Sequence, residues 1–231
     1  MKLVKFNSQS AAWIKIVAAV AALGVAGAAS AQSAGKFAVK VGVGEIAPQV
    51  HSGEVSAPAL PHTTADVGSD ARPIFDIMYG ITDNLSAVLA LGLPFRHDIY
   101  GAGAIAGTGK VGSTKALPPT AFLQYHFGAP EALFRPYVGL GATYAYFRDE
   151  TGSGQLTALT NTGGPATTFS IDNKLTATAQ AGLSIRVTEK VFADFMISKT
   201  RLRTVVHYST GQTQDMRLDP KTISMSIGYK F

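Results

Sequence analysis

The sequence predicts an all-β fold, an eight-stranded antiparallel transmembrane β-barrel with short periplasmic turns and longer extracellular loops. Three observations lead to this prediction. Apolar and polar residues alternate in eight segments, the connections between them are alternately long and short, and the chain begins with an export signal but has no later long apolar run. A closed barrel leaves no strand edge with unpaired polar groups in lipid.

The composition is more apolar than that of an ordinary soluble domain. Of the 231 residues, 46% are hydrophobic and only 15% are charged, and this length suits a single domain. The chain has no cysteine, which excludes disulfide bonds, thiolate-bound zinc and iron–sulfur clusters. We expect a membrane-associated protein without a cofactor.

The first 31 residues have the pattern of a secretory signal peptide. Three lysines precede the apolar run 16–28, and the small residues 29–31 form a cleavage site. The apolar run is too short to cross a bilayer comfortably as a helix. We therefore expect a cleaved signal peptide over residues 1–31 and a barrel in the cell outer membrane over residues 32–231.

The basic balance of the full chain comes mainly from this segment. Without its three lysines, Lys+Arg falls from 20 to 17 against 15 acidic residues, so the formal charge falls from +5 to +2. The charge therefore gives no reason to expect nucleic acid as a partner.

The first two expected strands span residues 37–44 and 74–81. In the first, valine alternates with glycine and Lys40 over about ten residues, the length that a tilted transmembrane strand needs. In the second, Phe75 lies on an apolar face and Asp76 on the opposite one. Each strand therefore has one apolar and one mixed face.

The third and fourth expected strands span residues 85–96 and 117–127 and contain prolines. In the third, leucine recurs on the apolar face up to Phe95, with Arg96 on the other face. The fourth alternates apolar residues with polar ones such as Gln124. Both keep a period of two, which indicates strands.

The second half of the chain supplies the other four strands, at residues 135–146, 175–185, 191–198 and 223–231. The last is the clearest, because every second residue from Ile223 to Phe231 is apolar and those between are serine, glycine and Lys230. Tyrosines near strand ends predict an aromatic girdle at the membrane surfaces. They are Tyr79, Tyr125, Tyr137, Tyr144, Tyr146 and Tyr229.

The connections run long, short, long, short, long, short, long. The long ones are polar or rich in glycine and threonine and lie near residues 47–71, 98–114, 150–172 and 208–218. The short ones lie near residues 82–84, 128–134 and 188–190. This asymmetry is typical of outer-membrane barrels, and an even strand number places both termini in the periplasm.

A soluble eight-stranded ligand-binding barrel is the main alternative fold, since it alternates in the same way with its apolar face inward. If the mixed face were the only interior of a soluble barrel, a large apolar belt would lie in water. The export signal, the terminal aromatic residue and the asymmetry of the connections favour the membrane orientation.

Several stretches in order along the chain resemble one family. They are residues 94–99 (PFRHDI), 115–120 (KALPPT), 124–128 (QYHFG), 135–141 (RPYVGLG), 217–220 (RLDP) and 228–231 (GYKF). They are similar to the OmpW family of small outer-membrane proteins, which includes alkane-uptake proteins of the AlkL type.

The resemblance implies a barrel that carries small hydrophobic molecules passively across the outer membrane and releases them sideways into the bilayer. Such an exit suits an apolar solute, because the acyl core is a good solvent for it. The partners we expect are outer-membrane lipid and lipopolysaccharide, a small hydrophobic ligand and the outer-membrane assembly machinery. We expect a monomer.

Three prolines are candidates for the lateral exit, namely Pro94, Pro118 and Pro119. Adjacent prolines remove ladder donors toward both neighbouring strands, which predicts a gap between strands three and four or between strands four and five. The alternative is that these prolines only end or bend a strand.

The inward faces hold two further sets of candidates. The apolar residues that could line a passage, or simply fill the barrel, are Met78, Val88, Phe122, Phe192 and Met196. The polar candidates for the lumen, of which the charged ones are expected to pair and plug the periplasmic end, are Lys40, Asp76, Gln124, Asp194 and Lys230. Tyr229 and Phe231 resemble the terminal signal that the assembly machinery reads.

Other functions have weaker support in the sequence. The five histidines include no i, i+2 or i, i+4 pair on one element, so we predict no metal site, although His51 and His62 in a loop leave that possibility open. His97 is expected to point outward, but no serine shares its height, so we predict no enzyme and no catalytic residue. The remaining alternative is a structural or receptor barrel whose loops bind protein partners without transport.

Overall fold

The computed structural model describes residues 34–59 and 61–231. The predicted signal peptide, residues 1–31, lies outside the described residues.

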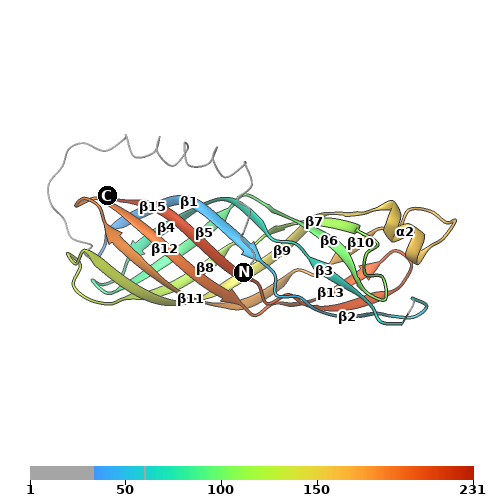
Figure 1. Cartoon of the computed structure of the whole chain (residues 1–231). Helices are drawn as coiled ribbons and strands as arrows, with labels where there is room; N and C mark the ends of the chain where they lie inside the picture. The colour runs from blue at the N-terminus through green and yellow to red at the C-terminus, as the bar shows by residue number, and fades with distance from the viewer. Residues whose placement is uncertain (1–33, 60) are drawn as a thin grey trace, which may run out of the picture.

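Eight antiparallel strands form a closed barrel (Figure 1). In chain order they are β1 (Phe37–Ala47), β4 (Asp70–Gly80), β5 (Leu85–Gly92), β8 (Thr120–His126), β9 (Phe134–Gly152), β11 (Lys174–Arg186), β12 (Val191–Thr200) and β15 (Lys221–Lys230). β1 pairs with both β15 and β4, and β9 pairs with β11 to close the sheet. The predicted fold class is confirmed.

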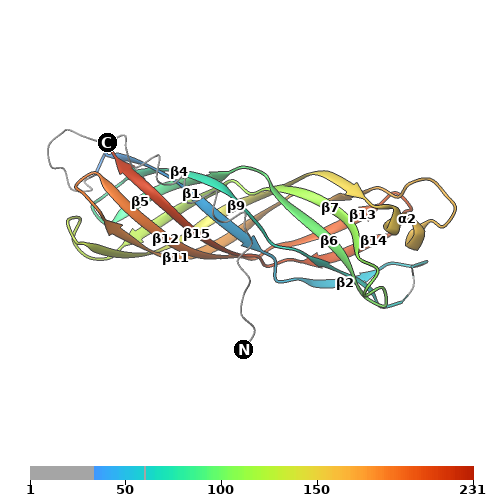
Figure 2. The same cartoon turned by 45° about the horizontal axis from the view of Figure 1, so that its top comes forward.

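The segments expected as long loops instead contain further strands that extend the barrel away from the C-terminus (Figures 1 and 2). They are β2 (His51–Val55), β3 (Thr63–Val67), β6 (Phe95–Gly103), β7 (Lys110–Leu117), β10 (Phe169–Ile171), β13 (Arg203–Tyr208) and β14 (Thr213–Arg217). The helix α2 (Gly154–Thr160) lies at the far end, and no helix in the described part of the chain is both long and apolar enough to cross a membrane.

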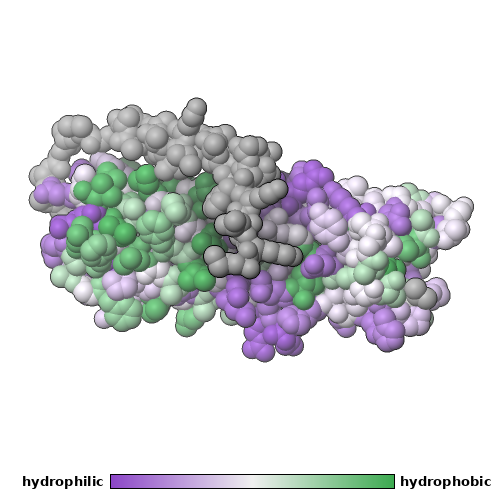
Figure 3. Space-filling view, viewed as in Figure 1, coloured by the Kyte–Doolittle hydropathy of each residue, from purple (hydrophilic) through white to green (hydrophobic). Residues whose placement is uncertain are grey.

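The two faces of the barrel wall have the polarity of a membrane protein. Outward apolar side chains are exposed, as at Leu140 (72%) and Leu175 (74%), whereas inward polar ones such as Gln124 (1%) are buried. Figure 3 shows the apolar surface over the barrel half of the molecule. A soluble barrel would have the opposite arrangement, so the membrane orientation is the one that the structure adopts.

The short connections are closed by side-chain hydrogen bonds. The hydroxyl of Thr82 accepts from the amide of Leu85 (2.9 Å), and that of Thr188 accepts from the amide of Val191 (3.0 Å). Asn84 donates to the carbonyl of His126 (2.7 Å) and so joins two neighbouring turns. These turns stand at the barrel end that carries the C-terminus, as predicted (Figure 1).

The pairing of the third and fourth strands is interrupted at their prolines. β5 pairs with β8 only up to Thr120, and pairing resumes between β6 and β7 at Ala116. In between, the four residues 91–94 face the three residues 117–119, an excess of one on the first strand. Such an excess is a β-bulge, and proline favours it because it has no ladder donor.

The extra residue reverses the inward and outward faces of the third strand. Leu93 is outward, as predicted, but Phe95 is buried and Arg96 is exposed, so the predicted register is wrong from Phe95 onward. The outward orientation predicted for His97 is wrong for the same reason, since it is buried. A shift of one residue moves every later side chain to the other face.

The C-terminal strand closes the barrel against the first. Val39 lies opposite Tyr229, and the amide of Phe231 donates to the carbonyl of Phe37 (2.9 Å). The rings of Tyr229 and Phe231 pack edge to face with centroids 5.2 Å apart. Phe231 is 62% exposed, so its ring is available to a binding partner.

If Phe231 is an assembly signal, Phe231→Ala should reduce the amount of folded barrel in the outer membrane several-fold while leaving uptake per folded molecule unchanged. The measurement is the heat-modifiable gel shift of membrane fractions. Phe127→Ala is the matched control, because it removes another exposed aromatic ring (46%) from the turn end of a strand. An equal loss in both variants would contradict a specific signal.

Candidate functional site

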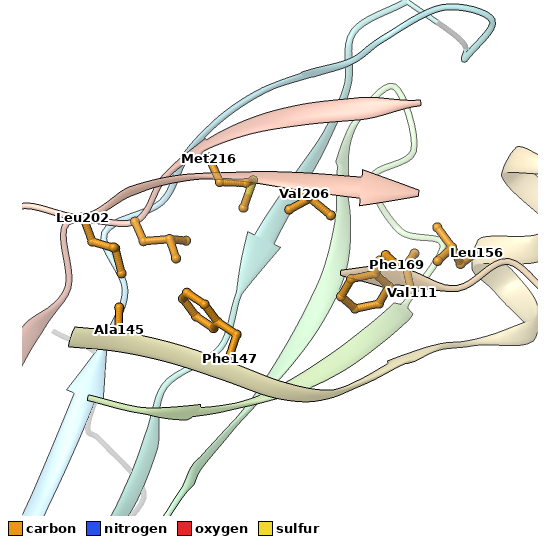
Figure 4. Close-up of a cluster of buried hydrophobic side chains, with 9 residues drawn as sticks. Val111, Ala145, Phe147, Leu156, Phe169, Leu202, Val206 and Met216 are labelled. Carbon is orange, nitrogen blue, oxygen red and sulfur yellow. The ribbon is translucent and has the colours of Figure 1, made fainter. Parts of the chain in front are cut away.

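We call the further strands and α2, which extend the barrel away from the C-terminus, the outer extension. It surrounds an apolar cavity of about 80 Å³. Figure 4 shows side chains from β9 pointing toward those that come from β13 and β14 across the cluster. The buried residues of this cluster are Val111, Ala145, Phe147, Leu156, Phe169, Leu202, Val206, Met216 and Leu218. The sequence offered no prediction of this cavity, because all of these residues except Ala145 lie outside the eight expected strands.

Local hydrogen bonds position the cavity wall. Ser153 caps α2 by accepting from the amide of Leu156 (3.2 Å), which turns the leucine side chain inward. The hydroxyl of Tyr208 donates to Gln214 (2.8 Å), and burial raises the pKa of this hydroxyl to about 12. The cavity therefore contacts neutral side chains at this point.

His97 also lies in the wall of this cavity. Its Nδ1 atom donates to the carbonyl of Gly68 (2.8 Å), and burial lowers the pKa of the imidazole below its usual range. The ring is therefore neutral at neutral pH. A neutral ring suits the wall of an apolar cavity. A catalytic serine would have to place its hydroxyl inside that cavity to contact the imidazole of His97.

A second cavity of about 100 Å³ lies below the first, within the barrel. The two share wall residues, namely Ile46, Pro118, Ala145, Leu202 and Pro220. The two cavities therefore adjoin along the barrel axis. We call them the upper cavity and the lumen cavity.

A row of threonine hydroxyls crosses the lumen cavity. Thr120, Thr143, Thr178 and Thr200, from four neighbouring strands, are joined by hydrogen bonds of 2.8, 2.5 and 2.8 Å. Because the hydroxyls bond to one another and that of Thr120 also donates to the carbonyl of Pro118 (3.1 Å), none of them is an unpaired donor in this largely apolar space. The sequence showed Thr120, Thr143 and Thr178 only as part of the mixed inward face, and Thr200 lies beyond the expected strand 191–198.

The lumen cavity reaches the interrupted ladder of the barrel wall. Leu91, Gly92 and Pro118 line it, and all three lie within the interruption. The carbonyl of Pro119 still accepts from the amide of Tyr144 (3.0 Å). The register of β9 with β7 and with β8 is also the same on both sides of the prolines. The gap therefore lies on the other side, between β5 with its continuation β6 and β8 with its continuation β7.

Apolar side chains fill the barrel below the lumen cavity. Met78, Val88, Phe122 and Phe192, all expected on inward faces, form one buried cluster with Ala38. The fifth expected residue, Met196, is half-buried and lies in the wall of the lumen cavity instead. We call the buried set the apolar floor.

Glycines on facing strands make room for the aromatic rings. Gly141 lies opposite Phe122, Gly182 opposite Tyr137, and Gly228 opposite Phe192. A Cβ atom at any of these glycines would lie 2.1 to 2.4 Å from the facing ring. The narrow lumen can therefore hold aromatic side chains only where the facing residue has none.

Buried charges lie between the lumen cavity and part of the floor, because on β1, β4 and β12 each charged residue stands two residues further from the periplasmic turns than the floor residue of that strand. The Lys40 ammonium is 3.0 Å from both Asp76 and Asp194, and its side chain is 3% exposed. The hydroxyl of Tyr137 donates to Asp194 (3.0 Å), and that of Ser184 does so at 2.7 Å. These five residues, from five strands, form what we call the charged plug.

Two predicted positions need correction here. Tyr137 is 1% exposed inside the barrel, so its assignment to the aromatic girdle is wrong, although its inward register was visible in the sequence. Lys230 lies outside the plug, with its Nζ atom 5.6 Å from the centroid of the Phe192 ring. Gln124 is buried on the same inward face, two residues from Phe122.

Within residues 34–59 and 61–231, no group of three or more His, Cys, Asp or Glu side chains is arranged to hold a metal ion. His62, one of the loop histidines considered for metal binding, instead pairs with Glu54 through its Nδ1 atom (2.9 Å).

The protein is a closed eight-stranded barrel with an exposed apolar belt, and its short turns lie at the end that carries the C-terminus. These features define an outer-membrane β-barrel protein. The chain belongs to the OmpW family, whose model matches residues 33–231. This confirms the resemblance seen in the sequence and the outer-membrane location.

Relatives and solved structures agree with this assignment. Outer membrane protein W of Vibrio cholerae is 30% identical, over 87% of this chain and 91% of that protein. Outer membrane protein AlkL of Ectopseudomonas oleovorans is 27% identical, over 83% and 78%. The crystal structure of OprG from Pseudomonas aeruginosa superimposes with a TM-score of 0.77 at 25% identity, over 87% of this chain and 99% of that one.

Lys40→Met should lower the free energy of unfolding by about 3–5 kcal/mol, because it leaves two buried carboxylates without their cation. The measurement is urea unfolding of the refolded barrel in phospholipid vesicles. Lys230→Met is the matched control and should cost less than about 1 kcal/mol, the usual contribution of a cation over a ring. Equal losses would show that the charged plug has no special role in stability.

Proposed function

We propose that this protein is a passive channel for small hydrophobic molecules, which enter from outside through the upper cavity and leave sideways into the bilayer. The observation that carries the proposal is that an apolar upper cavity adjoins, across five shared wall residues, a lumen cavity that reaches the interrupted ladder. The family assignment supports the same function, because the resemblance implied hydrophobic uptake.

Entry is favoured by the chemistry of the upper cavity. Its wall is made almost wholly of aliphatic and aromatic side chains such as Val111, Phe147 and Met216. Transfer of an apolar molecule from water to such a wall releases about 25 cal/mol for each Å² of apolar surface buried. The ligand class that suits this cavity is therefore apolar and small.

Passage straight through to the periplasm is opposed by the apolar floor and the charged plug. Opening the plug would separate Lys40 from Asp76 and Asp194, which leaves buried charges unpaired. It would also require Phe122 and Phe192 to leave their positions opposite glycines. A sideways route avoids both costs.

The interruption at residues 91–94 and 117–119 is the candidate exit. Unpaired backbone in a membrane-spanning wall is unfavourable unless it borders protein or a cavity, and here it borders the lumen cavity. Pro94 and Pro118 maintain the interruption because neither can donate to the ladder, whereas Pro119 is on the β9 side, where its carbonyl accepts from Tyr144. An apolar ligand in the lumen cavity is then separated from lipid by side chains alone.

Ala145→Phe should lower the uptake rate of an alkane or terpene about tenfold, because residue 145 is buried in the wall shared by the two cavities and a ring would fill the passage. The measurement is solute accumulation by cells with equal amounts of folded barrel. Ala142→Phe is the matched control, since it adds the same ring to the exposed, lipid-facing side of β9. Unchanged uptake in both variants would favour the receptor alternative.

Replacing both Pro118 and Pro119 by Val should restore ladder donors and slow uptake several-fold, with the barrel still assembled. The same accumulation assay measures the effect, and the gel shift reports assembly. Pro136→Val is the control, because this proline lies on the exposed face of a paired strand away from the gap. Normal uptake by the double variant would rule out the exit at this place while leaving the Ala145 test to judge transport itself.

A further inference from the structure

Five cations gather where the outward faces of β12 and β15 leave the apolar belt and pass into β13 and β14. They are Lys199, Arg201, Arg203, Arg217 and Lys221, and all five are exposed. Figure 3 shows hydrophilic residues collected at this level, between the apolar barrel half and the outer extension. We call these five residues the basic row.

The row contains two pairs of like charges that lie directly opposite each other. Lys199 is the cross-strand partner of Lys221, and Arg203 is that of Arg217. Like charges in such positions destabilise a sheet, and the sequence places them here twice along one hairpin. Repulsion of this kind is relieved when an anion binds between the cations.

Acidic residues near the row offset only part of its charge. Arg217 pairs with Asp219, which is itself buried, and the carboxylate of Asp219 also accepts from the amide of Leu202. Asp215 lies above the row, opposite Val205 on β13, whereas Glu45 lies below it on β1, opposite Ile223. The lower end of the row, next to the apolar belt, consists of Lys199, Arg201 and Lys221.

Three other cations of the outer half have acidic partners. Lys110 is 2.6 Å from Asp98, Lys115 is 2.8 Å from Asp149, and Arg96 is 3.7 Å from Asp98. The excess of positive charge is therefore a local property of the β12–β15 side and not a general property of the outer rim.

An apolar surface lies immediately below the row. Ile197 and Ile223 are cross-strand partners one step toward the periplasm from Lys199 and Lys221, and they are 51% and 62% exposed. The wall therefore presents aliphatic side chains and, just above them, cations. A matching ligand has acyl chains with anionic groups at their outer end.

We propose that the basic row binds the phosphate groups of one lipopolysaccharide molecule, whose acyl chains pack on Ile197 and Ile223. Lipopolysaccharide forms the outer leaflet of the outer membrane, and its phosphates lie at the level where the lipid-facing apolar surface ends. Lys199, Arg201 and Lys221 contact the phosphates, and Arg203 and Arg217 add charge above them. This inference concerns the lipid-facing wall and does not depend on transport.

The test is a titration of the full mature chain, in neutral detergent micelles, with purified lipopolysaccharide and with its dephosphorylated form. The triple variant Lys199→Gln, Arg201→Gln, Lys221→Gln should bind the phosphorylated lipid at least about tenfold more weakly, given about fivefold for each cation near an anionic surface. Removal of the lipid phosphates should weaken binding to the unmodified protein but have little further effect on the variant.

The matched control removes the same number of charges from paired cations, as Arg96→Gln, Lys110→Gln, Lys115→Gln. It should bind lipopolysaccharide as the unmodified protein does, and the gel shift should show both triple variants folded. Equal weakening in both variants, or unchanged binding by the first, would overturn the proposal. Inorganic phosphate that competes at concentrations similar to the lipid would also overturn it, because the site would then be a simple anion site.

Discussion

The whole structure depends on one constraint, that backbone N–H and C=O groups in the hydrocarbon layer must bond to each other because water is absent. The pairing of β9 with β11 meets this constraint by joining the last free edges of the sheet. It also fixes the position of the C-terminal strand, which pairs with both β12 and β1. Any departure from full pairing therefore needs a local cause.

The departure at residues 91–94 has such a cause, because three prolines lie within or beside it. The unpaired backbone faces a cavity on the inside, whereas the strands on either side keep their register. The same feature reverses the faces of β6, which brings Phe95 and His97 into the interior. One bulge thus opens the ladder and also builds part of the upper cavity wall.

The interior is divided by the size of an eight-stranded barrel. Such a barrel has room for side chains or for one small ligand. The lower half is occupied by aromatic rings seated opposite glycines and by the charged plug, whereas the upper half leaves space between hydroxyl and aliphatic groups. The outer extension continues this space beyond the barrel, so an apolar route leads inward but stops at Phe122 of the floor and Asp76 of the charged plug.

The sequence alone determined the eight strands, their outward faces and the short turns, because alternation and turn residues are local properties of the chain. It also indicated the family through stretches such as residues 135–141. Only the tertiary structure decided the reversal at Phe95, the hydrogen bond from Tyr137 to Asp194 and the meeting of Lys40 with Asp76 and Asp194. The cross-strand pairing of Lys199 with Lys221 belongs to the same group. These features depend on register between strands, which is set by pairing across the sheet and by a single extra residue, and alternation within one strand carries no information about either.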